Sequence, residues 1–175
     1  MIVELHHVVD PALERELVAL VARALPDPHL HGRWYWDSRP DAVVVARVVA
    51  GGPLVGLRLL IRRDVVVGAR RVSIVGTGVA VDPAWQRQGI ATALTERLLT
   101  EAEGRAAVVV FLGTEQARPL LDRFGFAPLT VPVTSLDPRG IEVVESAPCL
   151  VKELQPGFVA AVVAAGALCV GSGTW

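Results

Sequence analysis

Apolar and polar residues follow one another along the chain in patterns typical of strands and helices. Residues 2–9 are mostly apolar and predict a first strand. Asp10 and Pro11 then offer a side-chain cap and a fixed φ, which together favour the start of a helix. The next apolar residues share one helical face, and this helix is expected to end before Pro26. The residues on that face are Leu13, Leu17, Leu20 and Val21.

Three segments rich in Val and Leu come next and are separated by short turns. Residues 42–50 and 54–67 flank a glycine-rich turn at residues 51–53, and a second turn at residues 67–70 leads into residues 71–81. Strands joined by such short turns predict an antiparallel meander.

The hydrophobic period becomes helical at Arg87 and stays so to about Glu103. A buried strand over residues 106–112 follows. Because a helix connects the strand at residues 71–81 to this one, the two strands are expected to be parallel, with a right-handed crossover. Later patterns predict a helix over residues 115–124, a strand over residues 126–133 and a strand within residues 141–154.

The complete pattern predicts one mixed α/β domain over residues 1–175, with no repeat or linker. The segment after Pro156 allows a helix or two short strands, and its alanines favour the helix. A net charge of −1 without a basic stripe argues against a nucleic-acid partner held through its phosphates. Cys149 and Cys169 lack metal-ligand spacing, so we expect neither a metal site nor a disulfide framework.

The longest uncharged and mostly apolar run, residues 158–170, has 13 residues. A membrane span needs about 20, and the first residues do not resemble a signal peptide. We therefore expect a cytoplasmic protein without membrane contact. Residues 158–165 have no polar face, so we expect them to be buried on both sides, by the core and by a second subunit. A homodimer is the corresponding prediction.

The most informative segment is residues 79–94, which pass from a strand through a tight loop into a helix. Gly89 and Ala91 stand where a larger side chain would obstruct a ligand, and Arg87 adds a positive charge. The first N–H groups of a helix have no intrahelical partner and favour an anion. The segment therefore predicts a pyrophosphate site, with an ordinary strand-to-helix turn as the alternative.

Two common phosphate motifs are absent from this segment. A nucleoside-triphosphate P-loop needs Gly-Lys-Ser/Thr, whereas Ile90 follows Gly89. Gly76-Thr77-Gly78 lacks the third glycine of a dinucleotide fingerprint and lies within a strand pattern. The pattern that remains is Gln-x-x-Gly-x-Ala over residues 86–91.

This pattern, followed by the helix and Gly-Phe strand entry of residues 116–126, resembles the GNAT superfamily of N-acetyltransferases, which bind acetyl-coenzyme A. The resemblance covers residues 71–126 and implies a central mixed sheet of about seven strands flanked by helices. It also implies a V-shaped splay between the strands at residues 71–81 and 106–112, with the thioester in the gap. The residues it implies for the cofactor are Val79, Ala80, Val81, Gln86, Arg87, Gln88, Gly89, Ile90, Ala91 and Thr92.

Acetyl transfer needs a deprotonated amine and a proton for the leaving thiolate. The family often supplies a Tyr as the acid, but Leu121 occupies that position here and the only Tyr is Tyr35. The thiolate is then expected to leave unaided, through water, or with help from another group. Candidate bases are His29 and Glu115, with Asp82 as a further one.

The resemblance also implies an acceptor site rich in aromatic residues, which suits a ring-shaped, hydroxylated ligand. Its residues are His31, Trp34, Tyr35, Trp36, Asp37, Thr77 and Trp175. For Trp34 and Trp36, packing of the corner after the first helix is the alternative.

The chain end, Gly173-Thr174-Trp175, more narrowly resembles the aminoglycoside 2′-N-acetyltransferases, whose terminal carboxylate reaches the substrate. A catalytic role for the Trp175 carboxylate follows from that resemblance. Thr77 and Gly173 replace acidic residues of that group, so a less cationic antibiotic such as kasugamycin is expected. The alternatives are an N-acetyltransferase of another small amine or peptide and a non-catalytic acetyl-coenzyme A sensor.

Overall fold

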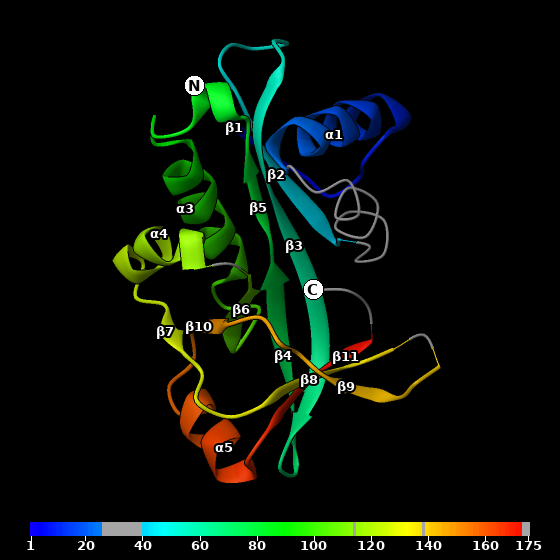
Figure 1. Ribbon diagram of the computed structural model, residues 1–175, viewed down its shortest axis with the longest axis vertical. Helices are drawn as coiled ribbons and strands as arrows, with labels where there is room; N and C mark the ends of the chain where they lie inside the picture. Colours follow the sequence, from blue (N-terminus) through cyan, green and yellow to red (C-terminus); the bar gives the residue numbers. More distant parts are fainter. Residues whose placement is uncertain (26–39, 114, 138, 173–175) are drawn as a thin grey trace. The chain divides into compact units, whose positions relative to one another are not determined.

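The computed structural model describes residues 1–25, 40–113, 115–137 and 139–172 (Figure 1). Two compact units divide the chain. Unit one comprises residues 1–61 and 78–101, and unit two comprises residues 62–77 and 102–175. The chain passes from one unit to the other within the long strand β3, Leu54–Val67.

Unit one is built from strands covered by two long helices. Its elements in chain order are β1 Ile2–His6, α1 Pro11–Ala24, β2 Ala42–Arg47, the first part of β3, β5 Val79–Val81, the short helix η2 Pro83–Trp85 and α3 Ile90–Ala102. The strands pair in the order β1-β2-β3-β5, with antiparallel neighbours throughout.

The helices α1 and α3 cover opposite faces of these strands (Figure 1). Successive residues of a strand point to opposite faces, so Leu57 and Leu59 of β3 face α1 while Gly56 and Arg58 face α3. The apolar face predicted for α1 is buried as expected, and Asp10 caps the helix by accepting from the N–H groups of Ala12 and Leu13.

Unit two contains the remaining elements. In chain order they are the end of β3, β4 Arg70–Thr77, β6 Val108–Leu112, η3 Glu115–Ala117, α4 Arg118–Arg123, β7 Ala127–Pro128, β8 Val133–Leu136, β9 Glu142–Val144, β10 Cys149–Glu153, α5 Phe158–Ala165 and β11 Leu168–Ser172. The parallel pairing of β4 with β6 confirms the predicted parallel pair.

The strands of the described residues form two sheets. The larger has eight strands in the order β1-β2-β3-β4-β6-β10-β7, with β5 beside β3, and the smaller has the order β11-β8-β9. The mixed α/β architecture with a large sheet and flanking helices is thus confirmed. The second sheet was not predicted, because its parallel pair joins β8 to β11 across some thirty residues of sequence.

Two predicted strands are shorter than expected. The strand at residues 71–81 is broken at Gly78, whose missing side chain weakens a strand interior. The strand at residues 126–133 is reduced to β7, because Pro128 and Pro132 cannot donate to a ladder. Residues 141–154 form two strands, β9 and β10, instead of one.

The segment after Pro156 forms the favoured helix, α5, followed by the strand β11. Glycines in left-handed conformation bound α5, Gly157 with φ 91° and Gly166 with φ 81°. Within this chain Phe158 and Val162 are buried, whereas Val163 is 47% exposed, so burial of the second side by another subunit is not tested. The homodimer stays a prediction. None of the helices in the described residues is both long and apolar enough for a membrane crossing.

Candidate functional site

The open edge of β5 is the first part of the candidate site. In the described part of the chain, β5 pairs with β3 alone. The Leu59 N–H donates to the Gly78 carbonyl at 3.0 Å, and the Asp82 N–H donates to the Val55 carbonyl at 2.9 Å. Backbone groups alternate in direction along an antiparallel strand, so those of Val79 and Val81 point away from β3. They form an edge to which an extended ligand can add like a strand.

The loop after β5 is the second part. Arg87 has φ 63° and Gly89 has φ 82°, and Arg87 is the one non-glycine residue with positive φ among those described. These two left-handed residues lie on either side of Gln88, in the turn that leads into α3. Arg87, Gln88 and Gly89 are exposed, so ligands can reach this loop.

Two glutamine side chains of the loop hydrogen-bond backbone carbonyls beside it. Gln86 donates through Nε2 to the Val81 carbonyl at 3.2 Å, and Gln88 donates to the Ala84 carbonyl at 3.4 Å. Gln86, the first residue of the predicted pattern, therefore has a structural role in holding the loop against the end of β5.

The amino terminus of α3 is the third part. The first helical hydrogen bond runs from the Ala93 N–H to the Gly89 carbonyl at 3.0 Å. The N–H groups of Ile90, Ala91 and Thr92 precede it and have no intrahelical acceptor. With the helix dipole and the Arg87 charge beside them, they suit an anion. All ten residues predicted for the cofactor lie in this part of unit one.

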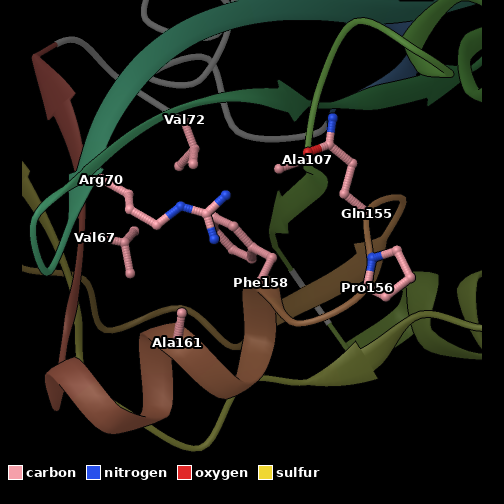
Figure 2. A pocket seen from close by; sticks show the side chains of 8 residues that line it. All are labelled: Val67, Arg70, Val72, Ala107, Gln155, Pro156, Phe158 and Ala161. Carbon is pink, nitrogen blue, oxygen red and sulfur yellow. The ribbon is translucent and has the colours of Figure 1, made fainter.

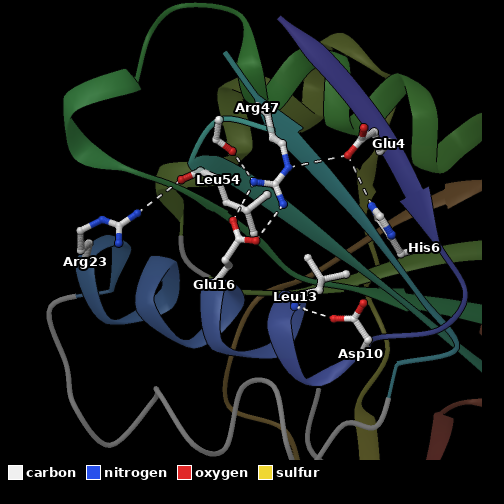
Figure 3. Close-up of polar contacts among 9 residues, drawn as sticks. Glu4, His6, Asp10, Leu13, Glu16, Arg23, Arg47 and Leu54 are labelled. Carbon is white, nitrogen blue, oxygen red and sulfur yellow. Dashed lines mark hydrogen bonds and ion pairs between the residues drawn. The ribbon is translucent and has the colours of Figure 1, made fainter. Parts of the chain in front are cut away.

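Asp82 is held by an ion pair that sequence reasoning missed. Arg23, in the last turn of α1, donates from Nε to the Asp82 carboxylate at 2.7 Å. Arg23 also donates to the Leu54 carbonyl at 3.3 Å (Figure 3). Only the basic residue near the end of the predicted helix hinted at this contact.

This ion pair disfavours Asp82 as the general base. Hydrogen bonds from Arg23 and from the Ala84 N–H lower the pKa of Asp82 below its ordinary value. A general base that accepts a proton from an amine works best with a pKa near the working pH. Asp82 instead stays ionised and organises the start of the loop.

The other predicted catalytic and acceptor residues are described only in part. Thr77 is buried at the end of β4, and Glu115 begins η3; both belong to unit two. Leu121, at the usual position of the acid, is fully buried in α4. The remaining predicted residues lie outside the described residues: His29, His31, Trp34, Tyr35, Trp36, Asp37 and Trp175.

Unit two contains a separate hollow between the β3–β4 turn and α5. Figure 2 shows the Arg70 guanidinium beside the Phe158 ring, with Gln155 on the opposite wall. No residue predicted for the site lines it. Within the described residues, no three His, Cys, Asp or Glu side chains gather as metal ligands.

Comparison with known protein families agrees with this fold and this strand–loop–helix arrangement. Residues 11–126 match the model of the acetyltransferase (GNAT) family. The chain belongs to that family. Comparison with the curated proteins found no match.

Solved structures show the same fold. A GNAT family N-acetyltransferase, YhbS from Escherichia coli in complex with CoA, is 22% identical with a TM-score of 0.67, covering 97% of this chain and 88% of that chain. Eis1 from Mycobacterium abscessus is 25% identical with a TM-score of 0.56 over 76% of this chain. The chain spans about a third of that protein, 33%. A GNAT acetyltransferase from Brucella melitensis in complex with acetyl-CoA is 22% identical, with a TM-score of 0.52 over 72% of this chain and 83% of that chain.

Proposed function

We propose that the chain is an acetyl-coenzyme A-dependent N-acetyltransferase that acts on a primary amine of a small molecule. The observation that carries this proposal is the open edge of β5 leading through the left-handed loop to the free N–H groups of α3. Family membership and the coenzyme complexes among similar structures support it.

In this proposal each part of the site holds a different part of the donor. Val79 and Val81 hydrogen-bond the amide groups of the pantetheine arm. The N–H groups of Ile90, Ala91 and Thr92, with Arg87, hold the pyrophosphate. The amine attacks the thioester carbonyl carbon, the tetrahedral intermediate expels the thiolate, and the nitrogen loses its proton to a base. With Leu121 at the usual acid position, water protonates the thiolate.

The acceptor is proposed to be an aminoglycoside-type antibiotic with few amines, such as kasugamycin, acetylated at a 2′-amine. The support is the group of aromatic residues before Asp37, which suits a ring-shaped, hydroxylated ligand.

Donor binding is tested by titration calorimetry with coenzyme A. Gly89→Glu is expected to abolish binding, because it places a negative charge where the pyrophosphate lies and strains a residue with φ 82°. Gly104→Glu is the matched control, since Gly104 also has positive φ, 70°, and open space around its Cβ position, but follows the other end of α3. Undiminished binding by Gly89→Glu would show that the loop is not the pyrophosphate site.

The acceptor is tested by thiol release from acetyl-coenzyme A with aminoglycosides, kasugamycin, polyamines and Lys peptides. Turnover with kasugamycin or a 2′-amino aminoglycoside supports the antibiotic assignment. Turnover with another amine alone replaces it with the alternative acceptor. Coenzyme binding without turnover across the panel favours the non-catalytic sensor.

A further inference from the structure

Arg58 is a charged residue in the most buried part of unit one. It lies in the middle of β3, between Val44 of β2 and Val79 of β5, and none of its surface is exposed. Its side chain faces α3, as does Gly56 two residues earlier, whose Cβ position is 2.7 Å from Ile90 Cγ2. The guanidinium therefore lies in the layer between the strands and α3.

The hydrogen bonds of Arg58 lead to the first turn of α3. One terminal nitrogen donates to Thr95 Oγ1 at 2.9 Å, and Thr95 Oγ1 donates to the Ala91 carbonyl at 2.6 Å. Ala91 is one of the residues whose N–H groups precede the first helical hydrogen bond. The relay thus connects the centre of β3 to the turn that would hold the pyrophosphate.

The charge of Arg58 has no counterion in the described part of the chain. Its Nε and second terminal nitrogen have no hydrogen-bond partner there. Burial lowers the pKa of Arg58 to about 9, because removal from water disfavours the charged form. The guanidinium nevertheless remains protonated at neutral pH.

An unpaired buried cation opposes folding, and an apolar side chain of similar size would remove that penalty. An anion that binds near a buried cation compensates the charge of that cation. Thr95 lies four residues beyond Ala91, which is about 6 Å along a helix at 1.5 Å per residue. The charge is therefore near the anion site and is only weakly screened by solvent.

We propose that Arg58 is a positioning residue for the donor pyrophosphate: through Thr95 it fixes the first turn of α3, and its charge becomes the buried countercharge of the bound anion. This inference rests on the proposed function. The proposed role needs no direct contact between Arg58 and the ligand, because Arg58 acts through its hydrogen bond to Thr95 and through its electrostatic field.

The test compares Arg58→Met, Arg58→Lys and Thr95→Val with the unaltered protein. The probes are coenzyme A, inorganic pyrophosphate and acetyl-pantetheine, which lacks the pyrophosphate. Arg58→Met is expected to weaken binding of coenzyme A about tenfold or more, as the loss of a charge at this range in a medium of intermediate dielectric implies. Its affinity for acetyl-pantetheine is expected to stay unchanged, since no anion is involved.

The two other variants separate charge from positioning. Arg58→Lys keeps the charge and is expected to recover part of the coenzyme affinity. Thr95→Val keeps the charge but breaks the relay, and is expected to weaken both coenzyme A and pyrophosphate by less than Arg58→Met does. Arg71→Met is the matched control: Arg71 is 76% exposed, so loss of its charge is expected to leave coenzyme affinity unaltered.

Thermal unfolding without ligand gives a readout that does not depend on the donor. Arg58→Met is expected to keep or raise the Tm of the free protein. A lower Tm would show that Arg58 has a structural partner and would overturn the proposal, as would equal losses for coenzyme A and acetyl-pantetheine. If the unaltered protein binds no coenzyme A, the proposed function itself fails, and this inference fails with it.

Discussion

Two arginines on neighbouring strands of unit one have opposite surroundings. Arg47 of β2 faces α1 and donates to the Glu16 carboxylate at 2.7 and 3.0 Å, with Glu4 at 3.8 Å (Figure 3). Arg58 of β3 faces α3, and among the described side chains its guanidinium hydrogen-bonds only the Thr95 hydroxyl. The hydrogen bond to Glu16 raises the pKa of Arg47, whereas burial lowers that of Arg58.

The different surroundings of the two arginines distinguish the strand face under α1, which has a structural role, from the face under α3, where we propose the donor site. Under α1 the chain supplies its own carboxylates, so the cation and its partners stabilise one another without any ligand. Under α3 the cation is left without a carboxylate in the described residues, next to the turn that the proposed donor would occupy. The same residue type thus stabilises the packing of a helix on one face and, in our proposal, supports the donor site on the other.

The largest effect expected in this comparison comes from Arg47→Met. The variant removes the guanidinium that joins Glu16 to the Gly52 carbonyl, and the Arg47 side chain is only 12% exposed. Glu16 stays partly hydrated, so the expected loss is about 2 kcal/mol of unfolding free energy, below the 3–5 kcal/mol of a fully buried pair. Urea unfolding measures it. No loss of unfolding free energy for Arg47→Met, as expected for Arg58→Met, would remove the distinction between the two faces.

A somewhat smaller effect is expected from Gly56→Ala, which tests how closely α3 approaches β3. The new Cβ would lie 2.7 Å from Ile90 Cγ2 and 3.0 Å from Leu94 Cδ1. Such overpacking typically costs about 1–3 kcal/mol, and we expect about 1.5 kcal/mol. In an Ile90→Leu background, which lacks Cγ2, the same substitution is expected to cost less. Equal losses in both backgrounds would place the strain elsewhere.

The smallest effect concerns acid stability on the α1 face. The hydrogen bond from Arg47 lowers the pKa of Glu16 below its ordinary 4.5, so the unfolded chain takes up a proton first as the pH falls. The stability that Glu16 contributes is therefore present above pH 4.5 and is lost as the pH falls below it. Because Glu16 is 41% exposed, we expect the difference from Glu16→Gln to stay below about 1 kcal/mol at pH 7. Tm values between pH 7 and 3 should converge; a constant difference would contradict this assignment.

Local patterns explain what could be predicted from the sequence. The helix α1 follows from the Asp10 cap and the spacing of Leu13, Leu17 and Leu20, all within one segment. The loop follows from Gln86, Gly89 and Ala91, because a strand, a tight turn and a helix start are themselves local. The β8–β9–β11 sheet did not follow, since the pairing of Leu168 with Val133 depends on distant contacts.

Contacts between distant segments could not be predicted in the candidate site either. The unpaired state of Arg58 could not be deduced, because only the fold reveals that no described carboxylate faces it. A charged residue within the apolar run of β3 was the one available signal. The pairing of Arg23 with Asp82, which are 59 residues apart in sequence, could not be predicted, because a basic residue in the last turn of a helix does not identify its partner.

Arg23 also has a consequence for the kinetics of unfolding. Its three hydrogen bonds join α1, β3 and the start of the loop through the Ala19 and Leu54 carbonyls and the Asp82 carboxylate. Such contacts between distant segments can form only after the elements have met. We therefore expect loss of the Arg23 side chain to speed unfolding more than it slows folding, as for interactions that form after the folding transition state.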